Sequence, residues 1–137
     1  MPNIFPVPAH LIVDVWREVE PFIKKANSHS LGESDEIDYL CSLVKGAYQL
    51  WMIRDENELK AVCVTEILVY PKMSKLLIGQ LCGEGMDEWL DNLISTLETF
   101  AKNNGCSYLE ARGRKGWIKA AEHLNFKPTY QIISKEL

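Results

Sequence analysis

The residues from 72 to 105 constrain the fold of this chain more than any other stretch. An apolar run over residues 75–82 has the composition of a buried strand, and it ends in the sequence Gly83-Glu84-Gly85. A helical pattern begins immediately at Met86, with apolar residues spaced three and four apart as far as residue 101. Glycines let the backbone approach an anion, and the start of a helix offers unpaired N–H groups. This stretch is therefore typical of a phosphate-binding turn.

The segments on either side predict a single α/β domain over residues 1–137. Apolar runs, helical spacings and turn residues place the other elements in order: a short strand at residues 4–8, helices at 9–28 and 37–45, strands at 48–54 and 59–70, and, after the long helix, a strand at 106–112, a short helix at 113–125 and a last strand at 127–135. The helix between the fourth and fifth strands implies that these two run parallel. The expected order is β-α-α-β-β-β-α-β-α-β, with a mixed and mostly antiparallel sheet.

The composition limits the kinds of partner that this chain is expected to bind. A formal net charge of −4 and a pI near 5.4 argue against nucleic acid and against an anionic membrane, because both would require a basic face. No apolar run approaches the ~20 residues of a membrane span, and the start lacks the pattern of a signal peptide, so we expect a cytoplasmic protein. The cysteines and histidines are scattered, which predicts no metal site.

The glycine-containing segment also carries a family resemblance. Gln80-Leu-Cys-Gly83-Glu-Gly85 lies between the expected fourth strand and the long helix. Its pattern and the order of elements resemble the GCN5-related N-acetyltransferase (GNAT) family, whose signature Gln/Arg-x-x-Gly-x-Gly/Ala holds the pyrophosphate of acetyl-CoA. The resemblance implies a splayed pair of fourth and fifth strands and acetyl-CoA as a substrate. It implies these binding residues: Gln80, Leu81, Cys82, Gly83, Gly85 and Met86.

A narrower resemblance comes from two short segments. Gly83-Glu-Gly-Met-Asp-Glu-Trp89 and Gly113-Arg-Lys-Gly-Trp117 look like parts of small GNAT-like proteins encoded by tailed phages and prophages. This implies the cytoplasm of a bacterial host as the location.

The sequence departs from the family in two places. Glu84 stands inside the glycine segment, with Asp87 and Glu88 just after it, and these carboxylates would repel a diphosphate. Many members have a tyrosine that protonates the leaving thiolate, and counting back from Asn125-Phe126 places Ala121 at that position. The two glycines can also serve only to make the turn into the helix.

Acyl transfer to an amine needs a base and often an acid. Glu66 interrupts an apolar strand and is a candidate base; the alternative is a carboxylate on the solvent face. Glu110 is a second candidate base, with an ion pair to an arginine as the alternative. Tyr130 is the candidate acid, although a tyrosine in such a strand more often only packs. Arg112 and Trp117 are expected to contact the substrate.

Three hypotheses follow, and the third of them is a ligand-binding or regulatory domain that fits the same residues but transfers no group. The first is transfer of an acetyl group from acetyl-CoA to a primary amine, on a small molecule or on a protein. The second is a catalytically inactive GNAT-like protein that acts by binding a protein partner, with a homodimer as one form of that association.

Overall fold

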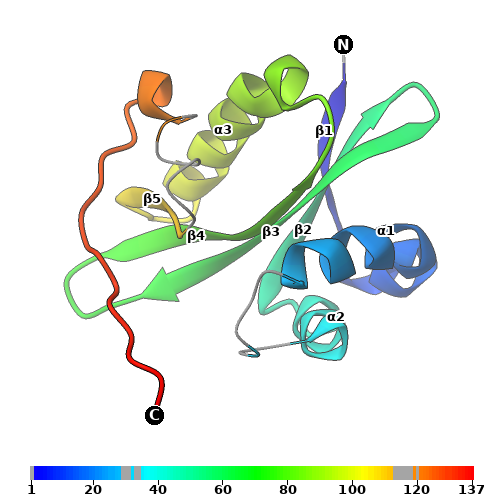
Figure 1. Cartoon of the computed structure of the whole chain (residues 1–137). Coiled ribbons are helices and arrows are strands. Elements are labelled where there is room, and N and C mark those ends of the chain that lie inside the picture. The colour runs from blue at the N-terminus through cyan, green and yellow to red at the C-terminus, as the bar shows by residue number, and fades with distance from the viewer. Residues whose placement is uncertain (1, 29–31, 33–34, 113–118, 120) are drawn as a thin grey trace.

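In the described part of the chain, five strands form one mixed sheet in the order β1-β2-β3-β4-β5 (Figure 1). The strands of the computed structural model are β1 (Asn3–Val7), β2 (Tyr48–Asp55), β3 (Glu58–Val69), β4 (Ser74–Gly83) and β5 (Tyr108–Ala111). The first four strands pair antiparallel, and β5 pairs parallel with β4. The structure describes residues 2–28, 32, 35–112, 119 and 121–137. The predicted α/β class, the mixed sheet and the parallel fourth and fifth strands are confirmed.

Helices cover both faces of the sheet (Figure 1). Helix α3 (Met86–Asn103) packs on one face, where its apolar stripe joins Trp51, Cys63 and Leu76 of the strands in a buried cluster. Helices α1 (Ile12–Asn27) and α2 (Glu36–Val44) cover the other face, over a second cluster that includes Leu50 and Val62. One-residue alternation along β2 and β3 sends successive side chains to opposite clusters, which is why both strands are apolar almost throughout.

The helices begin where the local sequence satisfies their free backbone groups. Asp35 accepts a hydrogen bond from the N–H of Asp38, and the Asp38 side chain accepts one from the N–H of Asp35, so a capping box starts α2. Gly85 precedes α3 with a φ of +68°, a conformation that favours glycine. A single 3-10 turn, η1 (Ala9–Leu11), leads into α1. No helix in the described ranges is long and apolar enough to cross a bilayer.

The prediction of a last strand at residues 127–135 is wrong. Residues 127–137 form no strand and run as extended chain past β5, drawn in red in Figure 1. Their apolar side chains stand in solvent: Tyr130 is 84% exposed, Ile132 84% and Ile133 93%. A strand needs backbone partners as well as β-forming residues, and the adjoining edge, β5, is only 4 residues long. The helix predicted at 113–125 lies mostly outside the described residues, and its described end is a short turn, η2 (Glu122–Leu124).

Candidate functional site

The turn from β4 into α3 is held by hydrogen bonds to the main chain of Glu84 on two sides. The N–H of Glu84 donates to the carbonyl of Lys60 on β3 at 3.0 Å. The carbonyl of Glu84 accepts a hydrogen bond from the indole Nε1 of Trp89 at 2.7 Å. The N–H of Glu88 closes the first turn of the helix by donating to the carbonyl of Gly85 at 2.8 Å. The conformation of this turn is therefore set by hydrogen bonds of its own main chain, one of which comes from the Trp89 side chain.

Free amides gather at the start of α3. Within the described chain, no acceptor is recorded for the N–H groups of Gly85, Met86 or Asp87. They belong to the first turn of an 18-residue helix, whose aligned peptides place a partial positive charge at this end. Such a group of amides can bind an anion.

Glycine is required at residues 83 and 85 for two different structural reasons. A Cβ on Gly83 would lie 2.3 Å from the Cβ of Ala61 and 2.4 Å from the carbonyl oxygen of Lys60, so no side chain fits beside β3. Gly85 has open surroundings, and its nearest neighbour would be the Glu88 carboxylate at 3.6 Å, but its φ of +68° disfavours any L side chain. The turn-making alternative explains both residues, and it leaves the free amides beside them available.

Next to this turn, β4 has no strand partner on its β5 side among the described residues. The parallel pairing ends at Ile78 with Ala111, and β4 continues over residues 79–83 without β5 beside it. The pairing thus ends near the point where the sequence predicts a splayed pair, and an unpaired backbone edge of this kind can hydrogen-bond to an extended ligand.

The predicted cofactor-binding side chains lie on both faces of β4 and, for Met86, at the start of α3. Leu81 and Met86 pack against the cluster under α3. Burial raises the pKa of the Cys82 thiol, which keeps it protonated. Gln80 donates from Nε2 to Oδ1 of Asn27 at 3.5 Å, and its Oε1 is buried without a recorded donor among the described residues. The groups of this turn that are available to bind an anion are therefore backbone N–H groups rather than these side chains.

Carboxylates surround the free amides. Glu84, Asp87 and Glu88 are all exposed at the start of α3. They complement the positive end of the helix, and they repel any anion that approaches it. The repulsion that the sequence predicts is therefore present, although solvent screens it.

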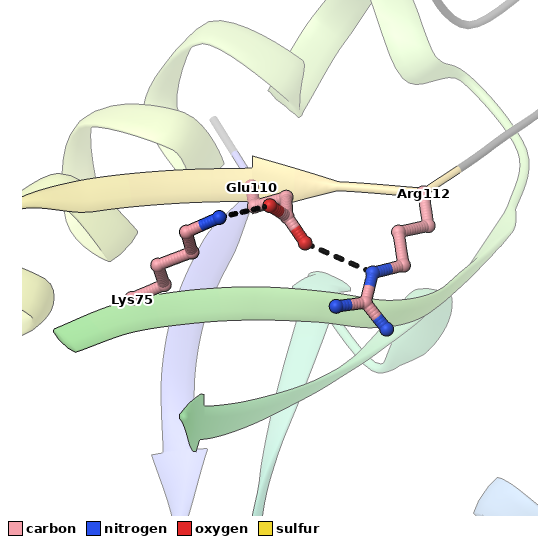
Figure 2. Close-up of polar contacts among 3 residues, drawn as sticks. All are labelled: Lys75, Glu110 and Arg112. Carbon is pink, nitrogen blue, oxygen red and sulfur yellow. Dashed lines mark hydrogen bonds and ion pairs between the residues drawn. The ribbon is translucent and has the colours of Figure 1, made fainter. Parts of the chain in front are cut away.

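Glu110 lies between two cations (Figure 2). Its Oε1 accepts from Nζ of Lys75 at 2.9 Å, and its Oε2 accepts from Nε of Arg112 at 2.9 Å. The hydrogen bond from Lys75 lowers the pKa of Glu110; burial opposes this, and the bond from Arg112 lowers the pKa further. Both carboxylate oxygens already accept a hydrogen bond, and the lowered pKa makes Glu110 a weaker base. The geometry therefore favours the ion-pair interpretation of Glu110 over a role as the catalytic base. Arg112, expected at the substrate, is used in the same network.

The ion pairs of Glu110 predict a dependence of stability on pH. The folded pKa lies below the ordinary value of 4.5, so the stabilisation is complete above that value and is lost as pH falls through the folded pKa. Glu110→Gln is expected to lower the melting temperature by a few degrees at pH 7, and by progressively less below pH about 4.5. Melts of both proteins from pH 7 to pH 3 test this, with exposed Glu98→Gln as the matched control. A difference that stays constant with pH would contradict it.

Glu66 and Glu110 occupy one row of the sheet. Glu66 pairs with Leu77 across β3 and β4, and Leu77 pairs with Glu110 across β4 and β5. Two strand spacings separate the carboxylate-bearing residues by about 10 Å. Glu66 is half-buried, and it also pairs with Tyr48 on β2, whose pKa is raised by burial and by the negative charge of Glu66. Glu66 thus lies at the centre of the sheet, with two strands to either side of β3.

The other predicted site residues lie elsewhere. Tyr130 belongs to the exposed C-terminal segment, and the centroid of its ring is 5.9 Å from Nζ of Lys75. Ala121, at the position where the family has a tyrosine, is buried at 7% exposure. Trp117 lies outside the described residues. Within the part of the chain that the structure describes, no three His, Cys, Asp or Glu residues form a group that could hold a metal ion.

A buried polar chain next to Glu66 could not be found from the sequence. The Trp51 Nε1 donates to the Thr65 hydroxyl at 3.0 Å, and that hydroxyl donates to Oε1 of Gln49 at 2.8 Å. Thr65 is fully buried. The register shift between Val64 and Thr65 accompanies this arrangement, and no local pattern signals it.

Solved acetyltransferase structures are similar to this chain over its whole length. An aminoglycoside acetyltransferase from an uncultured soil metagenomic sample has a TM-score of 0.76 at 9% identity, covering 100% of this chain and 99% of that one. A predicted acetyltransferase from Clostridium acetobutylicum, solved with acetyl-CoA, has a TM-score of 0.72 at 12% identity, covering 99% and 96%. A GCN5-related N-acetyltransferase from Ralstonia eutropha JMP134 has a TM-score of 0.70 at 14% identity, covering 100% and 99%.

These similarities show that the chain has the GNAT fold. The sequence itself matches no protein-family model and no curated protein. At identities of 9–14% the similarity establishes the fold, so the activity has to be argued from the site.

Proposed function

We propose that this protein is a GNAT-family N-acetyltransferase that moves an acetyl group from acetyl-CoA to a primary amine. One observation carries the proposal: the free N–H groups of Gly85, Met86 and Asp87 follow directly on the part of β4 that has no strand partner on its β5 side among the described residues. A diphosphate and an extended amide chain, the two features of CoA, fit such a pair of backbone surfaces. Structural neighbours solved with acetyl-CoA and with CoA support the assignment.

In this proposal, different residues of the chain bind the cofactor and transfer the proton. The amides at the start of α3 bind the diphosphate, and residues 79–83 bind the pantetheine arm, which directs the thioester toward the middle of β4. The amine nitrogen attacks the thioester carbonyl, the C–N bond forms, and the C–S bond breaks to release the thiolate of CoA. Glu66 takes the amine proton, directly or through water. We assign no general acid for the thiolate. The candidate, Tyr130, belongs to the exposed C-terminal segment, where its ring contacts Lys75 at the other end of β4 from the turn.

Charge at the site gives a test of the proposal. Acetyl-CoA is expected to bind the wild-type protein, and the double variant Glu84→Gln, Asp87→Asn is expected to bind it about five times more tightly. Each removed charge is worth up to about 1 kcal/mol at 4 Å in water, and the gain should shrink with added salt. Isothermal titration at two salt concentrations measures both effects. Glu98→Gln, on the same helix but away from its start, is the control. A wild-type protein that binds no CoA at millimolar concentration would refute the proposal.

The second candidate function is binding of a protein partner without catalysis. It is favoured by the exposed apolar side chains of the C-terminal segment, Tyr130, Ile132 and Ile133, and by the absence of a tyrosine at Ala121. Partners include a second copy of the chain. The same titration bears on both candidates, because a protein that binds no CoA leaves only partner binding. Turnover of acetyl-CoA with an amine then separates the acetyltransferase from a protein that binds CoA without catalysis. A phage or prophage origin and a location in the bacterial cytoplasm belong to either proposal, and they stay predictions of the sequence.

A further inference from the structure

We propose that Trp89 is a positioning residue for the anion-binding turn. Its indole N–H holds the carbonyl of Glu84 toward the core, and this keeps the N–H of Gly85 directed at the diphosphate of acetyl-CoA. The inference rests on the proposed function, since it requires a diphosphate at the start of α3.

The direction of the Gly85 N–H follows from the geometry of one peptide. The Glu84 carbonyl points at the indole of Trp89, which is only 2% exposed and belongs to the cluster between α3 and the sheet. In a planar trans peptide the C=O and the N–H point in opposite directions. The N–H of Gly85 therefore points away from that cluster, and the free amides of Met86 and Asp87 follow it in the chain.

The peptide on the other side of Glu84 is fixed as well. Its N–H donates to the carbonyl of Lys60, so β3 holds one peptide and Trp89 holds the next. The turn is thus set before any ligand arrives, which reduces the entropy that binding costs and aligns the donors.

Only the indole nitrogen of Trp89 is needed for this role. The helical spacing of Trp89 places it in the core, and another large apolar side chain would fill much of the same volume. A phenylalanine at residue 89 keeps an aromatic ring there and removes the donor. The separate effects of packing and hydrogen bonding can then be measured.

Trp51 supplies a matched control. It is also 2% exposed, it lies in the same cluster, and its Nε1 also donates a hydrogen bond, but to Thr65 on β3. Trp51→Phe therefore makes the same chemical change at the same burial without touching the turn.

The experiment compares CoA with pantetheine, which lacks the diphosphate. Trp89→Phe is expected to weaken CoA binding about tenfold, the effect of one lost hydrogen bond in a preorganised site. Trp51→Phe is expected to change it by less than about twofold. Pantetheine, measured by competition with CoA, should bind all three proteins equally. In NMR spectra of the free proteins, the Gly85 amide signal should shift in Trp89→Phe and stay in place in Trp51→Phe.

Each result decides a distinct point. Equal weakening in both tryptophan variants, or an equal loss for pantetheine, would show a general disturbance of the core and overturn the role of Trp89. Unchanged CoA binding in Trp89→Phe, or an unmoved Gly85 signal, would overturn it too. A wild-type protein that binds neither ligand would remove the proposed function itself and, with it, this role.

Discussion

Gly83→Ala is expected to destabilise the protein by about 3 kcal/mol, at the upper end of the range for overpacked sites. The new Cβ would meet the Cβ and Cα of Ala61 and the carbonyl oxygen of Lys60 within 2.5 Å. Most of these atoms are backbone, which cannot rotate aside, so β3 and β4 must separate locally. The same movement would break the hydrogen bond from the Glu84 N–H to Lys60. For a domain of this size the melting temperature should fall by about 10 °C.

Gly79→Ala is the matched control for this prediction. Gly79 lies on the same strand, and its added Cβ would make only an ordinary contact, 3.6 Å from the carbonyl oxygen of Val64. We expect a change within about 1 kcal/mol, since the alanine also restricts the unfolded chain. Thermal or urea unfolding of both variants tests the pair. Equal stabilities of the two variants would show that contact with β3 is not the reason for glycine at residue 83.

Thr65→Val is expected to cost about 2 kcal/mol although the two side chains have nearly the same shape. The valine leaves the buried Trp51 N–H without its acceptor and removes the donor to Gln49. An unpaired buried donor costs about 1–3 kcal/mol. Thr65→Ser keeps the hydroxyl and removes one methyl group, which costs about 1 kcal/mol.

The order of these two variants is the test. Urea unfolding followed by tryptophan fluorescence should find Thr65→Val less stable than Thr65→Ser. The reverse order would mean that Thr65 contributes through its methyl group, and that the Trp51 N–H finds another acceptor.

Local patterns were sufficient to predict the part of the fold that carries the site. The spacing of Leu90, Leu93 and Leu97 predicts one buried face on α3, and the structure buries all three. The apolar run before Gly83 predicts β4, and the helix after it predicts the parallel β5. These features depend on neighbours within one element, so the sequence alone contains them.

The features that the sequence could not predict depend on how strands that are distant in the sequence pair with one another. The reason for Gly83 is its pairing with Ala61, which follows a register shift near Thr65. Glu110 has an ion pair with Lys75 because β5 pairs with the start of β4, and alternation along one strand predicts only that Arg112 shares its face. The predicted last strand failed for the same reason: residues 127–135 have β-forming composition, but no edge pairs with them.

The backbone contacts at Glu84 have a consequence for how this protein can evolve. Lys60 and Trp89 hold the peptides around Glu84, whereas the side chains of Glu84, Asp87 and Glu88 project into solvent and do not determine the path of the chain. Substitutions at these three positions can therefore alter the local charge without remodelling the turn. Relatives could drift between strong and weak anion binding through single substitutions, while selection for a folded protein preserves the same loop in all of them.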